Sequence, residues 1–96
     1  MQDDAFEWDD GKAAANWRRH RISFEMARAA FDDDFATEQA DRDHDDAEEC
    51  VTLLGIVEHH LLFLSYTLRG NRIRIMSARK AEPHERRQYH NKDREV

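Results

Sequence analysis

The sequence predicts a small α+β domain with one antiparallel sheet, two helices near the N-terminus and one near the C-terminus. Three observations predict this fold class. Apolar residues recur at helical spacing over residues 12–31, and they alternate at strand spacing over residues 50–77 with turn signals between the runs. A proline, Pro83, then opens a last polar segment of helical character. Ninety-six residues suffice for a single domain, residues 1–96, with one core.

The N-terminal third should form a short strand and two helices. Residues 6–9 alternate apolar and acidic side chains, which is typical of a strand. A first helix is expected over residues 12–21, with a cap offered by Asp9-Asp10-Gly11, and a second begins at Ser23, because aspartate and serine are favoured N-cap residues. Three aspartates at 32–34 should end it, since acidic side chains are unfavourable at a helix C-terminus. The apolar stripes are Ala13, Trp17 and His20 in the first helix and Phe24, Ala27 and Phe31 in the second. We expect the aromatic residues of both stripes, with Trp8, in the core.

The main sheet is expected in the second half of the chain. Residues 50–57 and 60–68 are two apolar strands, and Glu58-His59 is a tight connection between them. Apolar residues on both faces of the second strand place it at the centre of the sheet, covered by helices. Residues 35–38 are expected to form a short edge strand, and residues 41–49 a charged loop.

A further strand and the last helix complete the fold. Gly70 and Asn71 suit a turn with positive φ, which leads into a strand over residues 72–77. Regular alternation places Ile73, Ile75 and Ser77 on one face of this strand and Arg72, Arg74 and Met76 on the other. Pro83 fits the first turn of a helix that runs from residue 84 to about residue 91.

The chain is acidic overall, but its charge is polarised. The formal net charge is −6; residues 1–50 hold 16 Asp and Glu against 6 Lys and Arg, whereas residues 51–96 hold 5 against 9. Four cationic side chains lie on or just after the last strand: Arg72, Arg74, Arg79 and Lys80. Because the planar guanidinium matches phosphate, this cationic strip suggests a nucleic-acid face. The alternative is a solvent edge held by salt bridges.

The last helix carries a second candidate constellation. Glu85 and Tyr89 lie four residues apart and share a helix face, and Arg86 lies three residues before Tyr89. A carboxylate, a guanidinium and a phenol can perform acid–base chemistry on a phosphodiester or stack on a base. The alternative is that Tyr89 docks the helix and Glu85 pairs with an arginine.

Other classes of protein and site are disfavoured. The apolar runs are too short to span a membrane, and the acidic N-terminus is unlike a secretory signal. The single cysteine, Cys50, excludes an internal disulfide framework, which suits a reducing cytoplasm, and we interpret it as a small structural residue. His44, in an acidic run, has no second His or Cys at zinc-ligand spacing, so we predict no metal and no cofactor.

Several of these residues together resemble the BrnT family of toxins. The resemblance is carried by residues 6–9, 12–16, 23–25 and 74–81, with His20, Phe31, Asp32, Glu85, Arg86 and Tyr89. It implies a RelE-like fold and a cytoplasmic ribonuclease that halts translation, working without metal through the 2′-hydroxyl of its RNA substrate. It also implies neutralisation by a small DNA-binding antitoxin, expected as a 2:2 heterotetramer that reaches operator DNA only through the antitoxin, and no membrane partner.

The resemblance also implies roles for individual residues. Arg74 and Arg79 would stabilise the phosphate, Glu85 or His44 would be the base, and Tyr89 or His44 the acid. RNA backbone outside the scissile group would be held by Lys12, Arg69, Arg72, Lys80 and Arg86. The chain departs from the family pattern at Arg21, where glycine is usual, at Cys50, where arginine is common, and at Glu82, where threonine is usual.

Two other functional readings stay open at this point. One is a non-catalytic module that binds nucleic acid or a partner, with the helical pair at residues 12–31 as an autoregulatory element. The other is a degenerate toxin that retains only antitoxin binding. A gel shift with the protein alone against DNA separates the first from a toxin, which should not bind operator DNA tightly without its antitoxin.

Overall fold

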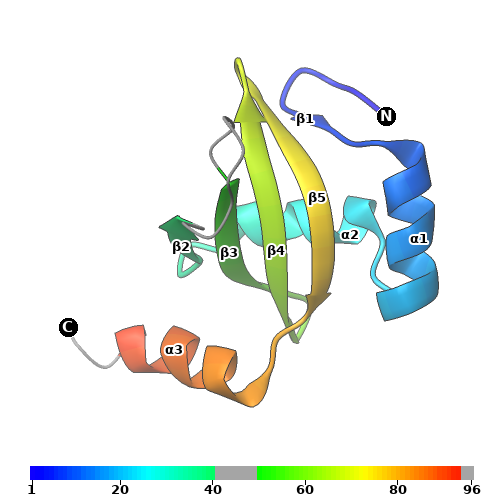
Figure 1. Cartoon of the computed structure of the whole chain (residues 1–96). Helices are drawn as coiled ribbons and strands as arrows, with labels where there is room; N and C mark the ends of the chain where they lie inside the picture. Colours follow the sequence, from blue (N-terminus) through cyan, green and yellow to red (C-terminus); the bar gives the residue numbers. More distant parts are fainter. Residues whose placement is uncertain (41–49, 94–96) are drawn as a thin grey trace.

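Figure 1 shows a computed structural model of the protein, which describes residues 1–40 and 50–93. In chain order the elements are β1 (Phe6–Glu7), α1 (Asp10–His20), α2 (Phe24–Arg28), the 3₁₀ helix η1 (Ala29–Asp32), β2 (Thr37–Ala40), β3 (Cys50–Val57), β4 (His60–Arg69), β5 (Arg72–Lys80) and α3 (Pro83–Asp93). The predicted α+β class is confirmed, with a five-stranded sheet and three α-helices in the described residues. The expected charged loop at 41–49 lies outside the described residues.

The five strands form one sheet in the order β1-β5-β4-β3-β2, so β4 is central, as its apolar faces predicted. β2 to β5 pair antiparallel, whereas β1 runs parallel to β5, with Phe6 opposite Ile73 and Glu7 opposite Arg74. The prediction of a fully antiparallel sheet is therefore wrong at this edge. Side chains alternate with the same two-residue period in parallel and antiparallel strands, so the alternation at residues 6–9 does not reveal the direction of β1. A parallel pair needs a long connection, and here most of the chain lies between β1 and β5.

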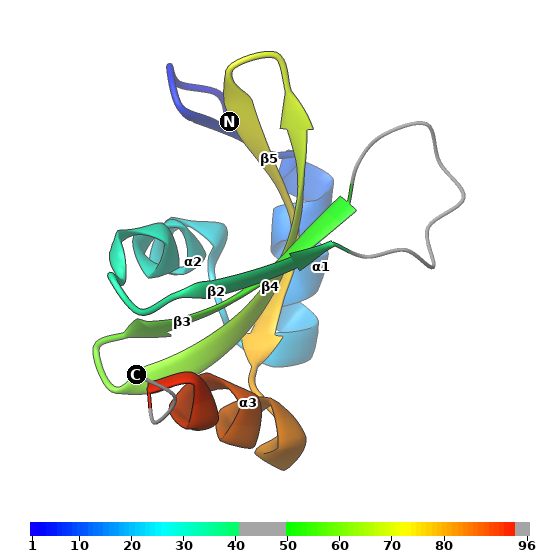
Figure 2. The same ribbon diagram turned by 90° about the vertical axis from the view of Figure 1, so that its left-hand side faces the viewer.

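Helices cover the two faces of the sheet unequally (Figures 1 and 2). The face that we call the core face packs against α1, α2 and η1 and contains the main apolar cluster, including Phe24, Leu62, Leu64 and Ile75. A smaller cluster of Leu54, Leu61 and Tyr89 joins α3 to the lower part of the opposite face, which we call the α3 face. The rest of that face carries polar side chains.

Close packing on the core face depends on Gly55. A Cβ atom at this position would lie 2.7 Å from the carbonyl oxygen of Ala30 in η1. Because that contact is with backbone, it cannot be relieved by a rotamer change, and η1 would have to move off the sheet. The glycine therefore allows η1 to lie directly on β3.

The pairing of β4 with β5 is interrupted by a bulge at Met76. Ser65 lies opposite Ser77, but the next residue, Tyr66, lies opposite Ile75, so Met76 is an extra residue in β5. Ile75 and Ala78 consequently both face the core, although they are three positions apart. The predicted alternation is correct as far as Ile75 and wrong at Ser77. The bulge reverses the phase of the strand, as bulges do.

A buried asparagine on α1 anchors this bulge. The Asn16 side chain donates to the carbonyl oxygens of Ile22 (2.9 Å) and Ala78 (2.8 Å) and accepts from the amide of Ala78 (3.1 Å). Asn16 is 7 % exposed, whereas Trp17 is 47 % exposed with the Arg21 guanidinium over its ring. The prediction that Trp17 belongs to the core is therefore wrong, because the buried side of α1 is polar where it meets β5.

The expected helix caps and turns are present. Asp9 accepts from the amide of Lys12 (2.9 Å) and Ser23 from that of Met26 (3.0 Å). The Glu58-His59 connection has positive φ at both residues, of 57° and 144°, which closes the β3–β4 hairpin in two residues. Arg21 ends α1 in the left-handed conformation, with φ 58°, the position where glycine is favoured.

Several element boundaries differ from the expectation. The expected second helix divides into α2, which ends at Arg28, and η1, which ends at Asp32, where the aspartates begin. The edge strand starts at Thr37 rather than residue 35, because Asp33 accepts from the amide of Phe35 (3.0 Å) and holds that residue in a turn. Within residues 1–40 and 50–93, no helix is long and apolar enough to cross a membrane.

Candidate functional site

The centre of the candidate site is Arg79, near the end of β5 on the α3 face. It lies opposite Phe63 of β4, and its guanidinium carbon is 4.3 Å from the centre of the Phe63 ring. Its two terminal nitrogens donate to the two carboxylate oxygens of Glu85, at 2.8 and 2.9 Å. The guanidinium is thus fixed by a bidentate pair and by the ring beneath it, which leaves it little rotamer freedom.

Glu85 has two partners, because it also caps α3. Its Oε1 atom accepts from the backbone amide of Glu82 (2.8 Å), the residue that precedes Pro83 and the first helical turn. This is the glutamate half of a capping box. Glu85 is 4 % exposed. The start of α3 and the orientation of Arg79 therefore depend on the same carboxylate.

The electrostatics of this pair follow from its geometry. Burial favours neutral Glu85, but the hydrogen bonds from Arg79 and Glu82 outweigh it, and the pKa of Glu85 is lowered. The hydrogen bonds that Arg79 donates to Glu85 also raise the pKa of Arg79. Glu85 is thus an anion at neutral pH and a weak base, because its lone pairs are already directed at donors.

Arg74 reaches the same face of the sheet as Arg79 because of the bulge. Its Nη1 atom donates to Glu7 of β1 (2.9 Å), and it lies opposite Thr67. Thr67 and Phe63 are four residues apart on β4, which separates the two arginine rows by about 13 Å. Ser65 and Ser77 lie between those rows.

The cationic strip lies on β5, and two of its arginines also form salt bridges, so the structure has features of both alternatives that the sequence left open. Arg72 donates from Nε to the carbonyl oxygen of Asp3 (2.8 Å), and Arg74 and Arg79 pair with Glu7 and Glu85. The sequence did not identify Glu7 or Asp3 as members of the site. The signal that could have found Glu7 is its place on the polar side of the alternating segment at residues 6–9.

Tyr89 has a different environment from Arg79. It is 4 % exposed, packs with Leu54 and Leu61, and donates to Asp33 Oδ2 (2.6 Å). Asp33 also accepts from the amide of Ile56 (2.8 Å). Glu85 and Tyr89 share the buried side of α3, as expected, but Tyr89 docks the helix against Asp33, the alternative that the sequence had left open.

The remaining predicted residues are distributed over the surface. Lys80 is exposed next to Arg79, Arg86 is exposed on α3, and Arg69 is exposed at the end of β4. Lys12 is exposed on α1 and borders a shallow hollow with Met76 and Ser77 of β5. His44 lies outside the described residues. Within the described part of the chain, no three His, Cys, Asp or Glu side chains converge as a metal-ligand set.

Two hydrogen-bonded carboxylates, the buried Glu85 and the partly buried Asp33, should make the fold sensitive to acid. Burial opposes the charged form of Asp33, but the hydrogen bonds from Tyr89 and from the amides of Ile56 and Phe35 outweigh it and lower its pKa below the ordinary 3.8. The pKa of Glu85 is likewise below 4.5. Since the unfolded chain binds protons more readily, these groups stabilise the fold fully above about pH 4.5, and the contribution is lost as pH falls through the lowered values.

We therefore expect the urea midpoint of unfolding to fall as pH is lowered from 5 to 3. The midpoint of the Asp33→Asn variant should fall less steeply, because this variant lacks one of the two carboxylates whose pKa is lowered. Urea titrations at pH 5, 4 and 3, followed by circular dichroism, measure both slopes. Equal slopes for the two proteins would show that Asp33 carries none of the linkage.

Comparison with known proteins identifies the family of the chain. A search of curated proteins finds no match to the chain. The family model described as ribonuclease toxin, BrnT, of type II toxin–antitoxin system matches residues 8–85, a range that includes Arg74, Arg79 and Glu85 and ends before Tyr89. Because this match spans most of the sequence, the chain belongs to the BrnT family of ribonuclease toxins of type II toxin–antitoxin systems.

Proposed function

We propose that this ribonuclease toxin cleaves RNA without a metal ion, using the 2′-hydroxyl of the substrate as nucleophile, on the α3 face around Arg79. The observation that carries the proposal is the fixed guanidinium of Arg79, which is paired with Glu85, stacked on Phe63 and placed on the same face as Arg74. Family membership supports the ribonuclease activity itself.

In the proposed reaction the 2′-oxygen attacks the adjacent phosphorus and the bond to the 5′-oxygen breaks. The products are a 2′,3′-cyclic phosphate and a 5′-hydroxyl. The extra negative charge on the phosphoryl oxygens must be stabilised, and preorganised cationic donors do so without reorganisation during the reaction. Arg79 is the group that we assign to this charge, with Arg74 on a neighbouring phosphate.

Two protons must also move, one from the 2′-hydroxyl and one to the leaving oxygen. We retain Glu85 and His44 as candidate bases and Tyr89 and His44 as candidate acids. The hydrogen bonds that lower the pKa of Glu85 favour a positioning role for it, and the Asp33 contact gives Tyr89 a docking role. His44→Ala therefore tests the proton-transfer assignment most directly: a loss of cleavage with unchanged RNA binding supports His44.

Arginines and lysines outside this centre would bind RNA backbone. Lys12, Arg69, Arg72, Lys80 and Arg86 are the residues that we assign to this role, since contacts to phosphate position a nucleic acid without reading its sequence. Their loss should weaken binding evenly over RNA sequences and reduce its dependence on salt.

The metal requirement gives a direct test of the proposed chemistry. RNA cleavage by the purified protein should persist in excess EDTA and leave 2′,3′-cyclic phosphate or 3′-phosphate ends. Total RNA incubated with protein in EDTA, with an Arg79→Ala control, provides the measurement. Activity that disappears in EDTA and returns with zinc or magnesium would overturn the metal-independent mechanism.

A protein antitoxin is the partner of this family of toxins. We propose that it covers Arg72, Arg74 and Arg79 with an acidic or amphipathic segment, in a complex of two toxins and two antitoxins that binds operator DNA through the antitoxin. Complementary charge would speed the encounter, and burial of apolar side chains would slow dissociation.

Co-expression with the antitoxin should therefore yield a heterotetramer that does not cleave RNA. Light scattering gives the stoichiometry, and an RNase assay compares the complex with the free chain. A stable complex that cuts RNA as fast as the toxin alone would place the interface elsewhere. A gel shift in which the toxin alone binds operator DNA would instead favour the non-catalytic binding module.

A further inference from the structure

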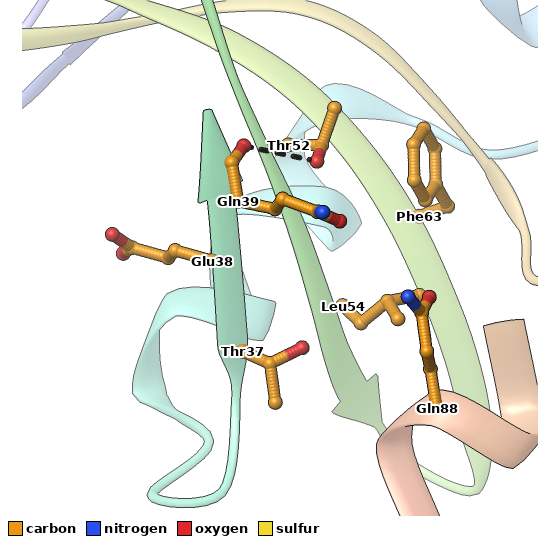
Figure 3. A pocket seen from close by; sticks show the side chains of 7 residues that line it. All are labelled: Thr37, Glu38, Gln39, Thr52, Leu54, Phe63 and Gln88. Atoms are coloured by element: carbon orange, nitrogen blue, oxygen red, sulfur yellow. Dashed lines mark hydrogen bonds between the residues drawn. The ribbon is translucent and has the colours of Figure 1, made fainter. Parts of the chain in front are cut away.

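A cavity of about 280 Å³ lies on the α3 face next to the Arg79 centre. Its walls come from β2, β3, β4 and α3, and Figure 3 shows the side chains that line it: Thr37, Glu38, Gln39, Thr52, Leu54, Phe63 and Gln88. Thr37 and Gln39 point into the cavity from β2, and Gln88 points toward it from α3. Of these residues, the proposed mechanism uses only Phe63, which positions Arg79.

The groups that face this cavity are uncharged. Glu38 borders it, but its side chain points to the other side of β2 (Figure 3). On that side, burial and the Glu38 carboxylate together raise the pKa of Tyr66 to about 12. The Thr52 hydroxyl donates to the carbonyl oxygen of Gln39 (3.2 Å). The lining that remains combines an aromatic ring and a leucine with the two amides of Gln39 and Gln88.

Both amides are available to a ligand. Within the described residues, neither the Gln39 nor the Gln88 side chain makes a hydrogen bond to the protein, and both side chains are exposed. A carboxamide presents a donor and an acceptor side by side, which matches the edge of a nucleobase, and an amide of this kind forms bidentate pairs with adenine in particular.

The cavity is adjacent to the proposed phosphate site through one side chain. Phe63 forms part of the cavity wall and also carries the guanidinium of Arg79 over its ring. An RNA whose phosphate binds Arg79 therefore brings a neighbouring base to the mouth of the cavity. Bases of single-stranded RNA are commonly bound in this way, beside an aromatic ring with their edges hydrogen-bonded to side chains.

We propose that this cavity is a subsite for one unpaired nucleobase of the RNA, next to the cleaved phosphate, and that Gln39 and Gln88 read its edge. The inference rests on the proposed ribonuclease site and adds to it a source of cleavage-site preference. Sequence preference then comes from uncharged side chains of β2 and α3, whereas the arginines bind any RNA.

Gln39→Leu and Gln88→Leu test the subsite, with Arg87→Ala as a matched control on the exposed side of α3. Cleavage sites in total RNA, free and ribosome-bound, are mapped for each protein by sequencing of the new ends. In each glutamine variant, the base preference at one position beside the cut should fall about tenfold, the scale of one bidentate base contact. Arg87→Ala should leave that preference unchanged, and all proteins should share the thermal stability of the parent chain.

The outcomes separate the subsite from the ribonuclease mechanism. If the parent chain cuts RNA and both glutamine variants keep its site preference, the subsite is wrong and the mechanism stands. If the parent chain cuts no RNA, the mechanism fails, and the subsite is judged by fluorescence anisotropy with short oligomers of A, C, G and U. Base-dependent affinity that both glutamine variants lose would support the subsite, and equal affinity for the four oligomers would overturn it.

Discussion

Arg79→Ala should slow RNA cleavage by about one to three decades, which corresponds to roughly 1.4 to 4 kcal/mol of barrier. The guanidinium that stabilises the proposed transition state is held in place by Glu85 and Phe63, so its loss cannot be replaced by a mobile surface cation. Arg79→Lys should also lose most of the rate, because an ammonium group cannot form the bidentate contact. Single-turnover cleavage of a defined RNA measures both variants.

The matched control for this prediction is Arg87→Ala. Arg87 is exposed on α3, away from the buried side that carries Glu85 and Tyr89, and its loss should change the rate little. The Arg79→Ala variant also leaves Glu85 buried without its cationic partner, so the melting temperature of this variant must be measured alongside the rate. If Arg87→Ala and Arg79→Ala slowed cleavage equally, diffuse charge rather than a defined site would explain the activity.

Asn16→Ala should destabilise the fold by about 3 kcal/mol or more. The substitution removes the partner of three buried backbone groups, the carbonyl oxygens of Ile22 and Ala78 and the amide of Ala78. Leaving one such group unsatisfied costs roughly 1 to 3 kcal/mol. A domain of this size has a total stability of about 5 to 15 kcal/mol, so a large share is at stake.

Urea unfolding followed by circular dichroism tests this expectation. Arg18→Ala, at an exposed position of the same helix, is the control and should shift the free energy of unfolding by less than about 0.5 kcal/mol. Asn16→Asp should be at least as destabilised as Asn16→Ala at neutral pH, because its carboxylate can accept from the Ala78 amide but buries a negative charge against the two carbonyl oxygens. A loss below about 1 kcal/mol in Asn16→Ala would mean that other groups satisfy the bulge.

The strands and helices were predictable where the signal is local. The caps at Asp9 and Ser23, the two-residue turn at Glu58-His59 and the central position of β4 follow from side-chain chemistry and apolar patterning within a few residues. The expected start and end of the last helix were also close to those of α3. The family resemblance, which the family match confirms, predicted the class of protein from several short motifs taken together.

What could not be predicted depends on contacts between distant segments. The three hydrogen bonds of Asn16 include two that join residues 62 positions apart, so its burial in place of Trp17 has no local signal. The parallel direction of β1 has none either. Likewise, the pairing of Arg74 with Glu7 depends on that strand being at the edge of the sheet. The cationic strip and the alternative of a salt-bridged edge were therefore visible in the sequence, but the partner of Arg74, Glu7, was not.

The bulge at Met76 reconciles an odd spacing of the two arginines with a common face of the sheet. Arg74 and Arg79 are five residues apart, a spacing that regular alternation would place on opposite faces, and the extra residue brings them to the same face. Deleting Met76 would remove the extra residue and leave Arg79 opposite Phe63. When related chains are aligned with this one, a one-residue gap between the two arginines should therefore mark the loss of the bulge, with both arginines still on the α3 face.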